Sequence, residues 1–221
     1  SKQPELKHAA VKILKAELPW SLLGVAWLPE GGALAAREAL RALMPQFSFA
    51  SCVPFQPAPV DAPQDAARTG LLFRAAADYA PDAALLSRIE HWLGLAGDEA
   101  LQYADPKKGQ RRTMKLVRTG SEARLDGFLL AGDTSAEAWI KTLLQDSLPA
   151  QSYGRLLLVP GSKAPADVVQ ATARRGRQVC ACFNVTDVAI GGFLAGLLLT
   201  LAGFQGAALR GGAEAGSMRP C

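Results

Sequence analysis

Apolar positions follow two periods along the first 160 residues, and these periods predict strands and helices. Short apolar runs bounded by Pro or Gly predict strands, whereas apolar residues three or four apart predict helices. The expected strands are 20–29, 47–55, 69–77, 100–105, 111–118 and 124–132, and the expected helices are 31–47, 82–95 and 136–148. This βαββαβββα order predicts an α+β fold, a mixed or antiparallel sheet with helices on one face.

Local signals refine the helix ends and faces. In the first helix we expect Leu34, Leu40 and Leu43 to share the buried face. Pro81-Asp82 is typical of a helix start, and Asp133-Thr134-Ser135 predicts a cap for the third helix. The alternation within residues 1–19 favours an edge strand.

Composition is that of an ordinary globular protein, with 49% hydrophobic and 20% charged residues among 221. The net charge of +4 is spread along the chain, so it does not favour nucleic-acid binding. The densest basic runs, Lys107 to Lys115 and Arg174 to Arg177, are interpreted as solvated loops or faces.

Four cysteines, unevenly placed, are too few for a disulfide framework. The first residues, SKQPELKH, lack the apolar run of a signal peptide and an initiator Met. We therefore expect a reducing, cytoplasmic setting and a chain that begins within a longer protein. No GxGxxG or phosphate-binding loop is present, and His8 and His91 are the only histidines. His91 falls inside an amphipathic helix, where a surface position is expected rather than a catalytic base.

The stretch GRQVCACFNVTDVAI, residues 176–190, contains two thiols one residue apart. It resembles the opening of the bacterioferritin-associated-ferredoxin-like domain, which holds a [2Fe–2S] cluster through a CxC and a later CxxC. The resemblance implies that Cys180 and Cys182 are two of the four thiolate ligands. It also implies sulfur hydrogen bonds from backbone N–H groups near 183–185, which would tune the potential.

The closing pair of that pattern falls in GGAEAGSMRPC, residues 211–221, where this chain departs from the family. Ala215 and Met218 stand at the two positions where thiolates are expected. Alanine offers no ligand atom, and a thioether is a poor substitute for thiolate on ferric iron. Cys221 lies three residues beyond Met218, and a fourth ligand would have to come from elsewhere, such as Cys52.

Two further stretches extend the resemblance over most of the chain. SKQPELKHAAVKI, residues 1–13, is similar to the end of the molybdopterin-dinucleotide-binding domain of molybdenum oxidoreductases, and assimilatory nitrate reductase in particular. Residues 103–117 with 125–140 resemble the region before the cluster domain of that enzyme. The resemblance implies that Lys7 lies close to the pterin, as a contact to molybdopterin guanine dinucleotide.

These resemblances define an expected organisation of the chain and an expected role. Residues 1–19 would end the molybdopterin-dinucleotide-binding domain, 20–160 form the α+β domain, 161–173 a linker, and 174–221 an incomplete, small helical [2Fe–2S] tail domain. The family is that of bacterial assimilatory nitrate reductase, whose C-terminal part passes electrons from a flavoprotein or ferredoxin partner toward a molybdenum site that reduces nitrate to nitrite. The chain would not be catalytic without the remainder of the catalytic subunit.

Two alternatives remain open from the sequence. In the first, the α+β domain is a docking or structural module and the tail binds no metal. In the second, residues 188–209, an uncharged run long enough to cross a bilayer, form a membrane anchor. Five glycines in that run, basic residues at both ends and the missing aromatic belt favour a buried soluble helix pair instead.

Overall fold

The computed structural model describes residues 18–55, 68–97, 100–176, 178–180, 185–188 and 190–193. The chain divides into two compact units, Ser1–Arg174 and Arg175–Cys221. The expected edge strand within 1–19 falls almost entirely outside the described residues.

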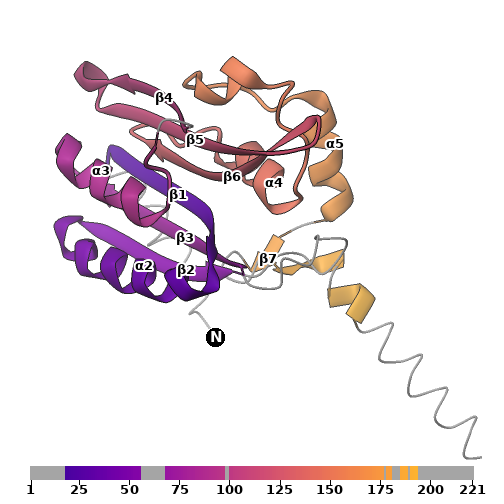
Figure 1. Cartoon of the computed structure of the whole chain (residues 1–221), viewed down its shortest axis with the longest axis horizontal. Coiled ribbons are helices and arrows are strands. Elements are labelled where there is room, and N and C mark those ends of the chain that lie inside the picture. Colours follow the sequence, from indigo (N-terminus) through magenta and orange to yellow (C-terminus); the bar gives the residue numbers. More distant parts are fainter. Residues whose placement is uncertain are drawn as a thin grey trace, which may run out of the picture. The chain divides into compact units, whose positions relative to one another are not determined.

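The first unit contains a six-stranded antiparallel sheet within the described residues (Figure 1). Its strand order is β2-β3-β1-β6-β5-β4. The strands are β1 (Trp20–Pro29), β2 (Phe49–Phe55), β3 (Arg68–Ala77), β4 (Ala100–Asp105), β5 (Gln110–Thr119) and β6 (Glu122–Ala131). Each agrees with an expected strand to within two residues at either end, and the α+β class is confirmed. Of the two sheet types expected, the sheet is the antiparallel one.

Strand β6 pairs with β1 along only part of its length. The β1–β6 register runs from Leu22 opposite Ala131 to Ala26 opposite Gly127. At that point the β5–β6 register shifts between Lys115 and Leu116, which is a β-bulge. Beyond the bulge, β5 and β6 continue as a paired ribbon to the turn at Gly120.

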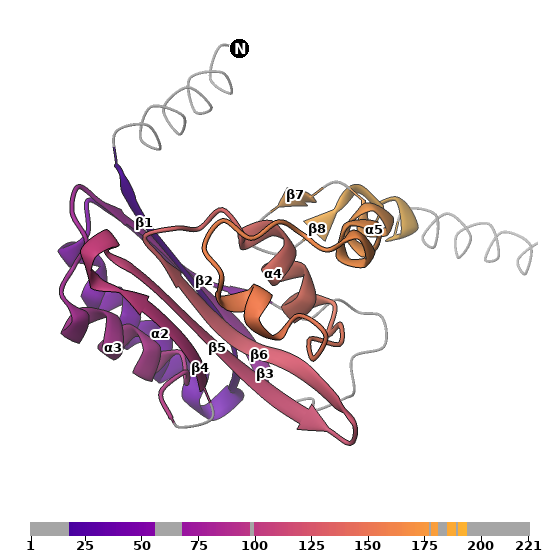
Figure 2. The ribbon, with the colours of Figure 1, turned by 90° about the horizontal axis from the view of Figure 1, so that it is seen from above.

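Helices cover both faces of the sheet, which corrects the expectation of helices on one face (Figure 2). α2 (Glu30–Leu43) and α3 (Ala83–Trp92) pack on one face, while α4 (Glu137–Gln145) and α5 (Ala166–Arg175) contribute to the core of the other. The described residues of the unit also form three 3-10 turns: η1 (Met44–Gln46), η2 (Pro106–Lys108) and η3 (Gly154–Leu158). The cause is visible in β1, where successive residues such as Leu22 and Leu23 are both apolar, so each face needs a cover.

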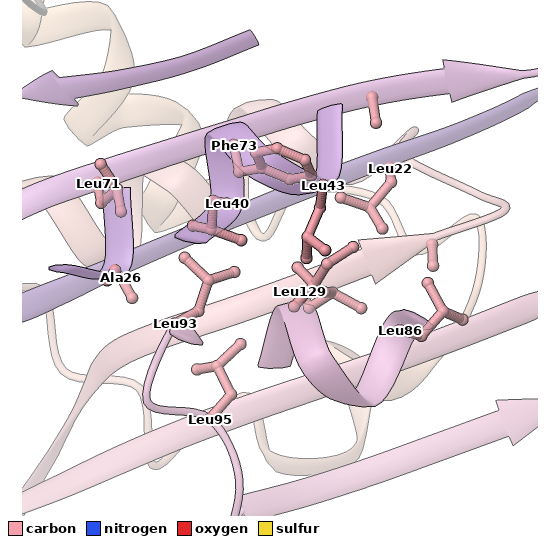
Figure 3. Packing of buried hydrophobic residues seen from close by; sticks show 14 of the residues in the cluster. Leu22, Ala26, Leu40, Leu43, Leu71, Phe73, Leu86, Leu93, Leu95 and Leu129 are labelled. Carbon is pink, nitrogen blue, oxygen red and sulfur yellow. The ribbon is translucent and has the colours of Figure 1, made fainter. Parts of the chain in front are cut away.

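The core under α2 and α3 is built from leucines of the helices against β1 and β3 (Figure 3). Leu40 and Leu43 of α2 and Leu93 after α3 are almost fully buried, with Phe73 of β3 among them. Burying a side chain of this size contributes about 1.5–3 kcal/mol relative to leaving it exposed. The second core, on the opposite face, includes Phe128 of β6 and Trp139 of α4.

The buried face of α2 differs from the expected one. Leu34 is 65% exposed, whereas the buried positions are Ala33, Ala36, Leu40 and Leu43. These four follow the spacing of a single helix face, and Leu34 lies outside it because it is six residues from Leu40. The start of α3 is confirmed, since the Asp82 side chain accepts a hydrogen bond from the Leu85 N–H at 2.6 Å.

The segment 161–173, expected to be a linker, contains most of α5. Val168 of this helix is 1% exposed and belongs to the second core. The segment therefore packs as part of the first unit.

The second unit, taken by itself, opens with a small hairpin. β7 (Gln178–Cys180) pairs antiparallel with β8 (Val185–Thr186), and helical residues follow at 187–188 and 190–193. The expected helical tail thus begins with strands, and residues 194–221 lie outside the described residues.

Glycine is required at position 132, and this requirement can be tested. Gly132 has φ +79°, and a Cβ there would lie 2.4 Å from the Gly109 carbonyl oxygen. Gly120 has a similar φ of +65° but open space around it. Gly120→Ala should therefore lose only the cost of the left-handed backbone, about 1–2 kcal/mol. Gly132→Ala should lose about 1–3 kcal/mol more through the clash. Urea unfolding of both variants measures the difference, and equal losses would contradict the close approach.

Candidate functional site

The cysteine segment begins at the end of a strand. Cys180 is the last residue of β7, and its backbone pairs with Val185 across the four positions that join β7 to β8. Just before the hairpin, Gly176 has φ +81°, and a Cβ there would lie 2.3 Å from Asp187 Oδ1. Glycine is therefore needed where the chain enters the hairpin beside the first helical residue.

The structure leaves most of the expected ligands untested. Cys182, Ala215, Met218 and Cys221 lie outside the described residues, as does Lys7, the expected pterin contact. At Cys180 only the backbone is described. The roles assigned to Lys7, Cys180 and Cys182 therefore stay predictions.

Cys52, considered above as a fourth ligand, has the properties of a core thiol. It lies on β2, half-buried, and packs against the core formed with α2 and α3. Burial raises the pKa of its thiol to about 11, although the charges of Arg37 and Arg41 act in the opposite direction. Because iron is bound by the thiolate, a thiol held protonated is a poor ligand.

The residues present therefore do not fit a four-thiolate cluster. Only three cysteines, Cys180, Cys182 and Cys221, fall within 174–221, and a [2Fe–2S] cluster of this type needs four thiolates. Among the described residues, no group of three or more His, Cys, Asp or Glu side chains could hold a metal ion.

A buried ion pair joins β5 of the sheet to the connection between β6 and α4. Arg112 of β5 is 1% exposed, and its Nη2 donates to Asp133 Oδ2 at 3.0 Å. The same carboxylate accepts from the Ser135 N–H at 2.9 Å and from the Gly161 N–H at 2.7 Å. Asp133 is therefore not a helix cap as expected: α4 begins after Ala136 with no side-chain cap, and Asp133 serves Arg112 instead.

The surroundings of this ion pair shift the pKa values of both Arg112 and Asp133. Burial lowers the pKa of Arg112, and Asp133 opposes that shift. For Asp133, burial acts to raise the pKa, but hydrogen bonds from Ser135 and Gly161 and the charge of Arg112 outweigh it. The pKa of Asp133 is held below its usual value.

Two neighbours of Arg112 anchor the opposite face of the sheet. Arg111 Nη2 donates to Glu90 Oε2 of α3 at 2.5 Å, and the Thr113 hydroxyl donates to the other carboxylate oxygen. Glu90 is 2% exposed, so these bonds satisfy a buried charge.

The basic run 107–115 is therefore not a solvated face throughout, which corrects the sequence interpretation. Lys115 also has a partner, Asp126 at the β-bulge, whose carboxylate lies 2.6 Å from Arg68 Nη2. Lys107 and Lys108 are exposed as expected. The sequence interpretation failed because the partners lie on other elements, and Glu90 and Asp133 are each 21 residues from the arginine that they bind.

A mostly apolar cavity of about 320 Å³ opens where β1 begins and β3 ends. Its polar lining comes from Ser21, Arg74, Thr134 and Glu137, each paired with another of the four. The Ser21 and Thr134 hydroxyls lie 3.0 Å apart, and Arg74 Nη1 donates to Glu137 Oε2 at 3.0 Å. The apolar lining consists of Leu18, Leu22, Leu23, Phe49, Ala75 and Ala76.

Among the described residues, no histidine or cysteine lines this cavity, and its carboxylate, Glu137, is held by Arg74. His91 is exposed at the end of α3, beside Trp92, which agrees with the expected surface position. Sequence reasoning missed the cavity because its lining comes from positions 18 to 137, and no local pattern signals that convergence.

Comparison with known proteins adds no relative: no family model, curated protein or solved structure matches the chain. Among the described residues, no helix combines the length and apolar character needed to cross a bilayer. Most of the 188–209 run lies outside those residues.

The Arg112–Asp133 pair should dominate the polar contribution to stability. Asp133→Ala leaves a buried guanidinium without its counter-charge and should lower the free energy of unfolding by about 3–5 kcal/mol. Glu38→Ala, the matched control, breaks the exposed pair with Arg41 and should cost at most about 1 kcal/mol. Urea unfolding near neutral pH measures both losses. Similar losses in the two variants would contradict the assignment.

The same comparison has a pH dependence of known sign. The pKa of Asp133 is lower in the folded protein than the unfolded value of about 3.9, so the ionised form stabilises the fold. The advantage of the parent over Asp133→Ala is therefore full above that pH and shrinks as the pH falls through the folded pKa.

Cys52 should be a slow nucleophile in the folded chain. With its pKa near 11, it should react with iodoacetamide at about pH 8 at least about 100-fold more slowly than in urea, where the thiol pKa is about 8.5. Mass spectrometry of the peptide that contains Cys52 follows the rate. The rate should still be rising above about pH 10, whereas a plateau reached by about pH 9.5 would show an ordinary thiol with a pKa near 8.5.

Proposed function

We propose that the chain is the C-terminal, electron-input portion of the catalytic subunit of a bacterial assimilatory nitrate reductase. In that family this portion receives electrons from a flavoprotein or ferredoxin and passes them toward a molybdenum site that reduces nitrate. The proposal includes no catalytic step within the chain. It rests on the resemblance of residues 1–13, 103–140 and 176–190 to that family.

The observation that carries the proposal is the CxC at the end of a strand. Cys180 ends β7, four positions separate it from Val185 of β8, and helical residues begin at 187. Cys180 and Cys182 are two residues apart, so their Cα atoms lie within about 7 Å of each other. That spacing lets both sulfurs reach one iron site, which supports the expected use of the pair.

The ligand set of this chain limits what the proposed portion does. Ala215 and Met218 stand at two of the four ligand positions, and Cys52 keeps its proton. The chain as it stands is therefore expected to hold no stable cluster, and the proposed electron input requires both thiols to be restored.

A docking role is the second candidate, and it concerns the sheet unit. The polar groups of its cavity are paired with one another, and the buried charges described above all have partners. Such a unit would bind a partner through its apolar surface and the shape of its cavity rather than through unpaired polar groups. This role is compatible with the first proposal, in which the unit would contact the remainder of the catalytic subunit.

Restoring the two thiols tests the cluster assignment. The Ala215→Cys/Met218→Cys double variant, reconstituted anaerobically with iron and sulfide, should absorb between about 400 and 600 nm, as the [2Fe–2S] chemistry requires. Iron and sulfide should be present in equal amounts, about two of each per chain. The parent chain should show neither the absorbance nor the bound iron.

Two controls identify the ligands. Cys180→Ser in the double variant should abolish the absorbance, whereas Cys221→Ser in the same background should leave it unchanged. A folded double variant that binds no iron and sulfide would refute the proposal. Retention of the cluster in the Cys180→Ser control would refute the role of the CxC.

A further inference from the structure

The cavity of the sheet unit has an open apolar surface that the described residues leave uncovered. Phe49 at its rim is 45% exposed, and Ala76, opposite it on β3, is only partly buried. The volume of about 320 Å³ is roughly twice the 150 Å³ that accommodates a benzene ring in a protein core. The space is therefore large enough for two branched apolar side chains.

The lining favours an apolar occupant over a polar ligand. Binding sites for polar molecules present a few unpaired donors and acceptors that fix the orientation of the ligand. Here the two hydroxyl side chains are hydrogen-bonded to each other, and Arg74 forms a two-bond pair with Glu137. A polar ligand would have to break these contacts before it could be recognised.

The chain itself supplies a candidate at the edge of the cavity. Leu18 is part of the lining, and residues 1–17 are joined directly to it. Within that segment, Val11, Ile13 and Leu14 lie four to seven positions before Leu18. A covalent connection this short gives an effective concentration in the millimolar range or above, far higher than a separate partner reaches.

We propose that residues 5–17 fold back over this cavity and fill it with their apolar side chains. The cavity would then be an internal docking site for the segment that enters the sheet. Lys7, Lys12 and Lys15 would remain at the solvent side, because a buried lysine without a counter-charge is costly. The inference does not rest on the proposed electron-input function, and its test involves no cluster.

Limited proteolysis of the full chain tests the proposal. Trypsin cleaves after Lys12 and Lys15, and docking should protect both bonds, because cleavage requires local opening. Ala76→Phe fills the cavity from β3 and should displace the segment. Cleavage at the two lysines should then be at least about tenfold faster than in the parent, which corresponds to about 1.4 kcal/mol of lost docking.

Two further variants keep the result interpretable. Ile13→Ser/Leu14→Ser removes the docking side chains and should accelerate cleavage to the same extent, with rates normalised to those of free peptides of the same sequences. Ala35→Phe adds the same ring at an exposed position of α2, on the other face of the sheet, and should leave the rate unchanged. Thermal unfolding shows whether each variant remains folded.

Three outcomes would overturn the proposal. The first is a parent chain cleaved as fast as the free peptide. The second is a rate that Ala76→Phe and the serine variant both leave unchanged. The third is protection that disappears on dilution, which would assign the cavity to a second copy of the chain. None of these outcomes bears on iron binding by the restored double variant, so failure here and failure of the proposed function are distinguishable.

Discussion

The buried charge of Arg112 is the constraint on which the layout of the sheet unit depends. A guanidinium at 1% exposure needs a fixed counter-charge, and Asp133 supplies it from the connection between β6 and α4. The Asp133 carboxylate also accepts a hydrogen bond from the Gly161 N–H, so the chain after η3 lies beside the same ion pair. Thr134 and Glu137, which follow in sequence, line the cavity, so two of its four polar lining residues lie close in sequence to the residue that neutralises Arg112.

Three consecutive residues of β5 couple the sheet to the layers on its two faces. Arg111 and Thr113 point to one face and bind Glu90 of α3, while Arg112 points to the other and binds Asp133. The alternation of a strand makes this possible without any distortion. The two apolar cores hold the helices against the sheet without fixing a direction. The hydrogen bonds of Arg111, Arg112 and Thr113 add directional contacts on both faces of the sheet.

The sequence predicted most helices and strands of the sheet unit, but it did not predict which side chains pair across them. Periodicity, Pro and Gly placed the strands β1 to β6 and the helices α2, α3 and α4 because those signals are local, as at Asp82, whereas most of α5 was expected to be a linker. The sequence did not predict the second helical layer or the use of Asp133, since each depends on residues far along the chain. Leu34 was misassigned for a local reason, because six residues from Leu40 place it off the buried face of α2. The cavity could not be predicted from the sequence because its lining residues come from positions 18 to 137. For the cysteine segment, the sequence gives the CxC, and the structure adds the strand end at Cys180.

The bulge at Asp126 divides the β5–β6 hairpin into two parts that differ in the number of neighbouring strands. Up to Gly127, β6 is held by β1 and β5 together, whereas beyond it only β5 continues as its strand partner towards Gly120. At the bulge, the Asp126 carboxylate forms ion pairs with Arg68 and Lys115. Leu125 of the outer ribbon still belongs to the second core, but Arg118, Gly120 and Ser121 at its tip are exposed. Related chains that gain or lose residue pairs at this tip would therefore keep the same register in the remainder of the sheet.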